Sequence, residues 1–224
     1  MRRKKRQEMG VDDSNGLRPS ERHNFCLIGL IPDQIQELGR LFAQEDREKL
    51  SMYLREEAGI PWSKSFEDTW DEAGDEVARA RGLFDLIWHR RALAIDPVVN
   101  APDFTGFDVL LSIAQQAVPE VAELLVKVDG NNSSNPRRSE GPEWWGIWHQ
   151  ANGSKPAGWL SAEEAAHIHK LWSDLATPEV EEACLTIMGI PYTHPGCWSL
   201  MEEFGGFFAQ CLSERRSVVG EVDL

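Results

Sequence analysis

The chain is poor in cysteine and has no long apolar run. Among 224 residues there are four cysteines, none in a Cys-x-x-Cys spacing: Cys26, Cys184, Cys197 and Cys211. Such scattered cysteines do not form the disulfide framework of a small secreted domain, so we expect a reducing, cytoplasmic environment. No apolar run reaches the roughly 18 residues that a membrane-spanning helix needs, and we expect no membrane association.

Basic residues are also scarce. The 23 Lys and Arg are outnumbered by 37 Asp and Glu, which gives a net charge of −14. Residues 1–24 have a net charge of +3, so the remaining 200 residues have −17. A body this acidic argues against broad binding of a phosphate backbone. Its surface suits a basic protein partner instead.

The first 24 residues are almost devoid of apolar side chains and predict a disordered basic arm. Five consecutive cations begin it: Arg2, Arg3, Lys4, Lys5 and Arg6. This run is typical of a solvated tail, and a nuclear signal or a nucleic-acid-binding arm remain alternatives. It does not match a secretory signal, because no apolar stretch follows the charges.

Residues 25–224 predict a single acidic, helix-rich α+β domain with about six to seven helices. The apolar runs near 25–31 and 217–222 predict strands that pair in a small sheet. The Asn-, Ser- and Gly-rich stretch 129–142 predicts a flexible loop.

Helix periodicity and capping signals are clear at several points. Helices are expected at about 46–58 and over 66–87, where an apolar seam is flanked by carboxylates between Glu67 and Glu76. Residues 121–128 are apolar and fit either a strand or a short helix. Ser161-Ala-Glu-Glu164 and Ser199-Leu-Met-Glu202 both predict a capping box at a helix start. The stripes that contain Cys184 and Cys211 predict core positions for both thiols.

Tryptophan is concentrated in one short segment. Four of the nine Trp fall between 144 and 159, beside His149: Trp144, Trp145, Trp148 and Trp159. Aromatic side chains on a loop can form a partner hot spot or a stacking platform. The alternative is an aromatic cluster packed beneath the long loop.

His194-Pro-Gly-Cys197 is the best candidate for chemistry. A loop can direct His194 and Cys197 at one metal ion, or bring them together as a base and a nucleophile with Glu202 nearby. A structural metal site needs about four ligands, which the spacing does not supply, so we expect no metal and no cofactor. Fingerprints of serine hydrolases, P-loop enzymes and dinucleotide-binding enzymes are absent from the sequence.

Two segments carry a resemblance to a known family. Gly158-Trp-Leu-Ser-Ala-Glu-Glu-Ala165 is similar to the helix entry of the YfbM-like family of uncharacterised bacterial proteins. Residues 204–222, an aromatic helix that leads through Arg215-Arg216 into an apolar strand, also resemble that family, as does the early strand followed by Pro32-Asp33. These pieces cover about a third of the chain, and the insert at 131–142 departs from the pattern. The resemblance implies an α+β fold and no established activity.

These patterns lead to one expected function and two alternatives. We expect a non-enzymatic protein-binding module, of a regulatory or immunity type, that binds a basic protein through its acidic body. A hydrolase or metal-dependent enzyme centred on His194 and Cys197 is the first alternative. A nucleic-acid adaptor acting through residues 2–6 is the second. The oligomeric state is left open by the sequence.

Overall fold

The computed structural model describes residues 25–43, 48–49, 52–53, 93–95, 106–129, 135–151, 155–174, 177–188 and 195–222. Their strands are β1 (Phe25–Leu30), β2 (Leu93–Ile95), β3 (Lys155–Leu160) and β4 (Ser217–Val222). Their longer helices are α1 (Pro32–Ala43), α5 (Gly106–Ala117), α6 (Pro119–Leu125), α7 (Glu143–Ala151), α8 (Ala162–Ser173), α9 (Thr177–Met188) and α10 (Pro195–Glu214). A 3-10 turn, η2 (Pro136–Arg138), precedes α7. The helix-rich α+β class is therefore confirmed.

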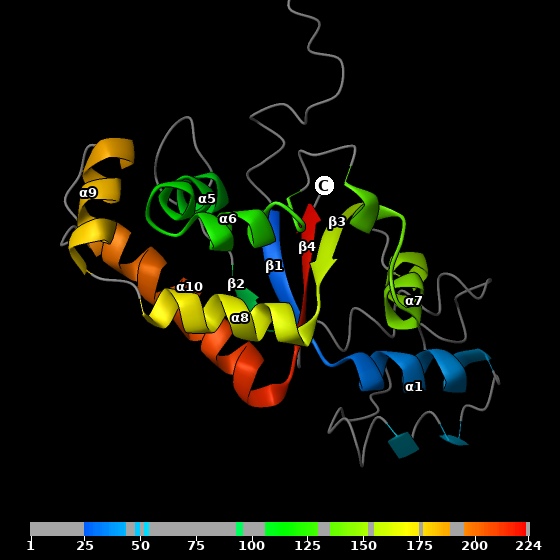
Figure 1. Ribbon diagram of the computed structural model, residues 1–224. Coiled ribbons are helices and arrows are strands. Elements are labelled where there is room, and N and C mark those ends of the chain that lie inside the picture. The colour runs from blue at the N-terminus through cyan, green and yellow to red at the C-terminus, as the bar shows by residue number, and fades with distance from the viewer. Residues whose placement is uncertain are drawn as a thin grey trace, which may run out of the picture.

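The four strands form one antiparallel sheet in the order β2-β1-β4-β3 (Figure 1). The first and last strands of the chain are its central pair, with Phe25 opposite Val222 and Leu30 opposite Ser217. The predicted strands near 25–31 and 217–222, and their pairing, are confirmed. The two outer strands, β2 and β3, were not predicted from the sequence.

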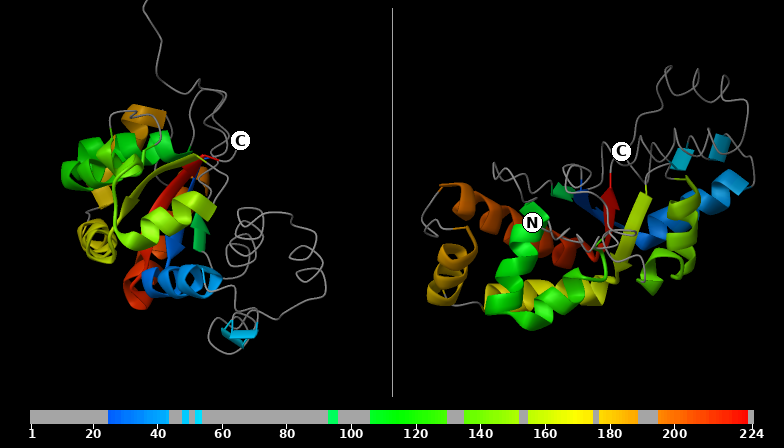
Figure 2. Two further views of the ribbon diagram at one scale, coloured as in Figure 1. Left: turned by 90° about the vertical axis from the view of Figure 1, so that its right-hand side faces the viewer. Right: turned by 90° about the horizontal axis from the view of Figure 1, so that it is seen from above.

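Helices cover both faces of the sheet (Figure 2). Successive side chains of a strand point to opposite faces, and neighbouring residues accordingly enter different cores. Leu27 and Val218 pack in the larger core with α5, α6, α8, α9 and α10. Ile28 and Val219 pack in a smaller core with α1 and α7. The sheet thus separates an aliphatic and phenylalanine-rich core from a tryptophan-rich one.

Several local predictions can be compared with the helices. Residues 119–125 form the helix α6, so the apolar stretch 121–128 begins as a helix and ends in a turn, and it contains no strand. Ser161 and Glu164 form the predicted capping box at the start of α8. The second predicted capping box is wrong, because α10 begins at Pro195 and Ser199 lies inside it. There the Ser199 hydroxyl donates to Glu203 one turn later, at 3.0 Å. The expected helices at about 46–58 and 66–87 lie largely outside the described residues.

The predicted core cysteines are confirmed. Cys184 and Cys211 are fully buried, and Cys26 is half-buried; no disulfide joins these three among the described residues. Burial raises the pKa of the Cys211 thiol to about 12, which makes it an unreactive packing group. Among the helices that the structure describes, none has the length and apolar character required to cross a bilayer.

The end of α10 is held by an unusual arginine. Arg215 follows the helix with a φ of 52°, in the left-handed region that glycine adopts without strain. The next amide, Arg216 N–H, donates to Cys211 O at 2.8 Å and closes the helix. Arg216 is buried and donates from its guanidinium to Gly29 O at 2.8 Å and to the Glu214 carboxylate. Arg216, which directly follows the strained residue, therefore connects the end of α10 to the central strand pair.

Replacing Arg215 with glycine should raise the free energy of unfolding by about 1 kcal/mol, because glycine relieves the left-handed strain. Ser213→Gly, inside the last turn of α10, should lower it by about 0.5 kcal/mol because of glycine's poor helix propensity. Urea unfolding followed by circular dichroism measures both. A loss of stability in Arg215→Gly would show that the Arg215 side chain makes a stabilising contact that outweighs the strain.

Candidate functional site

The predicted tryptophan surface is part of the smaller core. Trp144, Trp145 and Trp148 lie on the helix α7, not on a loop, and their side chains are only 5%, 2% and 1% exposed. They pack with Ile28, Leu30, Ile35 and Val219, where α7 lies against α1. This arrangement agrees with the alternative interpretation of the sequence, a packed aromatic cluster. These three rings are buried and do not form a surface on which a partner could stack.

The aromatic rings meet edge to face. Trp144 lies with its ring centroid 6.3 Å from Trp145 and 5.9 Å from Trp159, and Trp145 lies 6.0 Å from His149. Trp159 is half-buried on β3 and donates from Nε1 to Glu140 O at 2.9 Å. Trp145 Nε1 is buried without an acceptor among the described residues. Of the predicted set, the structure thus brings together Trp144, Trp145, Trp148, Trp159 and the exposed His149.

The candidate at His194 and Cys197 is not brought into this cluster. His194 lies outside the described residues, and so does the side chain of Cys197, whose backbone is in the first turn of α10. The structure therefore gives neither residue a position from which to argue chemistry. Within the part of the chain that it describes, no three His, Cys, Asp or Glu side chains lie together as a metal site would require.

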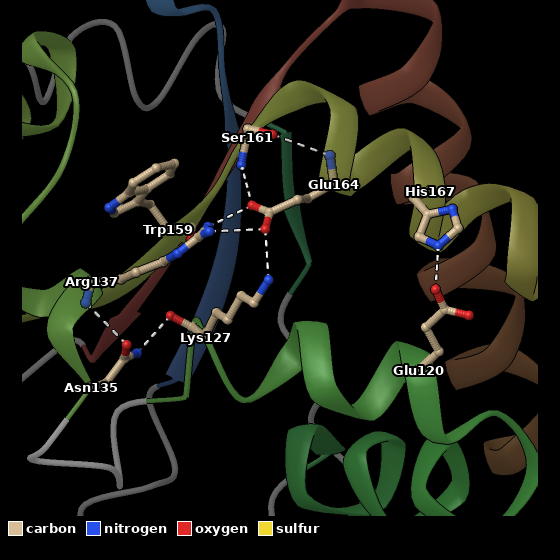
Figure 3. A network of polar contacts seen from close by, with 8 residues as sticks. All are labelled: Glu120, Lys127, Asn135, Arg137, Trp159, Ser161, Glu164 and His167. Carbon is tan, nitrogen blue, oxygen red and sulfur yellow. Dashed lines mark hydrogen bonds and ion pairs between the residues drawn. The ribbon is translucent and has the colours of Figure 1, made fainter.

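A different cluster, centred on Glu164, joins three segments (Figure 3). Glu164 is the third residue of α8, and its carboxylate accepts from the Ser161 amide at 3.0 Å while Ser161 Oγ accepts from the Glu164 amide at 3.2 Å. Two cationic side chains also donate hydrogen bonds to the Glu164 carboxylate. Arg137 donates two hydrogen bonds to it, at 2.5 and 2.9 Å, and Lys127 Nζ donates one at 2.7 Å.

Arg137 also attaches this cluster to the outer strand. Its Nη1 donates to Trp159 O at 3.0 Å, and its guanidinium carbon lies 4.3 Å from the centre of a Trp159 ring. A planar guanidinium can bind a carboxylate and contact an aromatic ring at once, which lysine cannot do. One side chain therefore connects η2, β3 and α8.

We call residues 135–138 the latch. Asn135, which is buried, accepts from the Arg137 amide at 3.1 Å and donates to Lys127 O at 2.7 Å. Lys127 O in turn lies against Gly158 of β3, where a Cβ atom would come within 2.0 Å of it. Only glycine allows this approach. The latch lies in the second half of the predicted loop 129–142, and side-chain contacts bind it to its surroundings.

The electrostatics of the cluster favour an ionised Glu164. Partial burial of the carboxyl raises its pKa, but hydrogen bonds from Arg137, Lys127 and the Ser161 amide outweigh that effect and lower it to about 2. The start of α8 adds a positive helix end beside the carboxylate. This charge is thus fully compensated by fixed donors.

The geometry of this cluster suits a structural contact between α8, β3 and the latch and not a chemical reaction. Ser161 Oγ is already engaged as the cap of α8, and no histidine contacts it within the drawn cluster. His167 instead lies one turn further along α8 and is directed at α6, with Nε2 2.7 Å from Glu120 Oε1 in an exposed pair (Figure 3). The sequence signal for this cluster was the capping box alone, since Arg137 and Glu164 are 27 residues apart.

No family model, curated protein or solved structure matches the chain. The resemblance to the YfbM-like family therefore stays a prediction.

Glu164→Gln should make the free energy of unfolding less dependent on pH in the acidic range. The folded pKa of Glu164 is about 2 and its ordinary value is 4.5, so its stabilisation is complete above pH 4.5 and disappears as the pH falls towards 2. The wild type should lose up to about 3 kcal/mol more than the variant across that interval. Urea unfolding at several pH values measures the difference. Glu123→Gln, which removes an exposed carboxylate of α6, is the control, and equal slopes in both variants would contradict the assignment.

Gly158→Ala should destabilise the protein by about 3 kcal/mol, because the new methyl group meets the rigid Lys127 carbonyl. Gly146→Ala, on an exposed position of α7 with no atom within 4 Å of its Cβ, should stabilise by about 0.5 to 1 kcal/mol. Thermal unfolding of the two variants measures this pair. Similar melting temperatures would show that the close approach of Lys127 to β3 does not exist in solution.

Proposed function

We propose that the chain is a non-enzymatic protein-binding module, of a regulatory or immunity type, whose partner is a basic protein. The observation that carries the proposal is the charge of the stretch 171–214. It contains seven carboxylates and not a single lysine or arginine. An uninterrupted field of one sign attracts a partner of the opposite sign and orients it on approach.

Much of this charge is exposed on two helices. α9 and the first half of α10 lie at the end of the molecule away from α1 and α7 (Figures 1 and 2). Among the side chains of the stretch that the structure describes, the exposed carboxylates are Asp174, Glu181, Glu182, Glu202, Glu203 and Glu214. No ion pair joins Glu181 or Glu182 to another residue that the structure describes. These two charges are available to a partner.

α9 also exposes an apolar side chain among its carboxylates. Val180, Ala183 and Cys184 are buried on the side that packs against α5. The opposite side bears Glu181 and Glu182, and Leu185 one turn later is 48% exposed. Desolvated apolar contacts contribute most of the affinity at protein interfaces, while surrounding charges set orientation and rate. The outer side of α9 offers both to a basic, amphipathic partner.

The double variant Glu181→Gln/Glu182→Gln should weaken binding of an amphipathic helical peptide made of lysine and leucine about tenfold, because it removes two charges beside Leu185. Binding is measured by isothermal titration calorimetry, and a rise from about 50 to about 300 mM salt should weaken it further. A peptide with glutamate in place of lysine should not bind.

The matched control is Glu140→Gln/Glu143→Gln, which removes two exposed carboxylates next to α7. It reduces the net negative charge by the same amount but should retain wild-type affinity. Equal losses in the two double variants would contradict a binding surface on α9. From a cell extract, the wild type should retain a basic protein that the α9 variant releases, and retention by neither would contradict the function itself.

A further inference from the structure

The acidic surface of α9 has a complement of opposite charge in the same chain. Residues 2–6 are five consecutive Lys and Arg, and no other run in the chain has more than two adjacent cations. The stretch 171–214, in contrast, contains carboxylates and not one Lys or Arg. Residues 2–6 lie outside the part of the chain that the structure describes, which begins at Phe25. Opposite charges are therefore concentrated in two separate segments of one molecule.

Glu181 and Glu182 are the carboxylates best placed to accept such a segment. Both side chains are exposed, and neither carboxylate bonds to another residue that the structure describes. On α10, two of the three exposed carboxylates already accept hydrogen bonds, from Ser199 at 3.0 Å and from Gln210 at 2.8 Å. Carboxylates without a fixed donor keep their full attraction for a cation that arrives from elsewhere.

The length of chain before Phe25 is sufficient to bring residues 2–6 to α9. The 18 residues between Arg6 and Phe25 can extend over about 60 Å. A domain of about 200 residues has a radius of gyration of roughly 17 Å and is therefore about 40 Å wide. α9 packs against α5, and α5 lies between α9 and β1, the strand that begins at Phe25 (Figure 1 and the right-hand view of Figure 2). The path from Phe25 to α9 is thus shorter than the available chain.

We propose that residues 2–6 of this chain dock on the outer side of α9, beside Glu181 and Glu182, and compete there with the basic partner. The competition rests on the proposed function, whereas the docking needs no partner. A tethered segment has an effective concentration of about 1 mM, roughly a hundredfold above that of the same segment on other copies at about 10 μM. The chain's own segment is therefore the favoured occupant. Exposed ion pairs are individually weak and are screened by salt, so docking is partial, and a partner that also contacts Leu185 displaces it.

Carbodiimide coupling in the full chain tests the docking directly, because it joins an amine only to a carboxylate in contact with it. At about 50 mM salt it should link Lys4 or Lys5 to Glu181 or Glu182, and mass spectrometry of chymotryptic peptides detects the product. The yield should fall at least about threefold at about 300 mM salt. In a mixture of isotope-labelled and unlabelled chains, the two linked peptides should carry the same label.

Glu140 and Glu143, which are also exposed but lie next to α7, are the internal control and should be linked far less. No coupling at α9, coupling between differently labelled chains, or equal coupling at the control carboxylates would overturn the proposal. Coupling confined to the carboxylates at 67–76 would overturn it as well.

Replacing all of residues 2–6 with glutamine should raise the affinity of the chain for the lysine–leucine peptide about threefold at about 50 mM salt, because the competing segment is removed. The same replacement in the Glu181→Gln/Glu182→Gln variant should give no gain, because the docking site is already lost there. Equal gains in both backgrounds would show a general effect of charge and overturn the competition. A peptide that binds neither background while the cross-link persists would contradict the proposed function alone and support the docking.

Discussion

The described structure around the end of β3 depends on one interaction, the binding of the Glu164 carboxylate by its hydrogen-bond donors. Glu164 accepts hydrogen bonds from the Ser161 amide, the Lys127 ammonium and the Arg137 guanidinium. A partly buried charge is costly unless fixed donors surround it, and these donors come from three different segments. The start of α8, the position of β3 and the latch therefore depend on one another.

Two arginines perform the same task at β3 and β1, the strands on either side of β4. Arg137 bonds Trp159 O and Glu164, while Arg216 bonds Gly29 O and Glu214. Each guanidinium neutralises a carboxylate and satisfies a strand carbonyl. In a chain with 23 basic residues, cations used in this way are not available to offset the surface charge elsewhere. Because these two arginines are bound to carboxylates and carbonyls within the fold, they do not neutralise the carboxylates on the outer side of α9.

Local signals in the sequence were sufficient for part of the fold. The apolar runs near 25–31 and 217–222 predicted β1 and β4, and Ser161 with Glu164 predicted the start of α8. β3 could not be predicted, because Pro156 and Gly158 break the pattern of a strand and its role comes from pairing with β4. Ser199 carries a capping signature inside a helix that begins one turn earlier.

The Glu164 cluster was beyond local sequence patterns, since no spacing rule relates Arg137 to a carboxylate on another element. Its most direct test is a titration of the Glu164 side-chain carboxyl carbon by NMR in the folded protein. A midpoint near pH 2 in the wild type, rising towards 4.5 in Arg137→Gln, is the result expected from the donors around this carboxylate. A wild-type midpoint near 4.5 would contradict the cluster as the tie between the latch, β3 and α8.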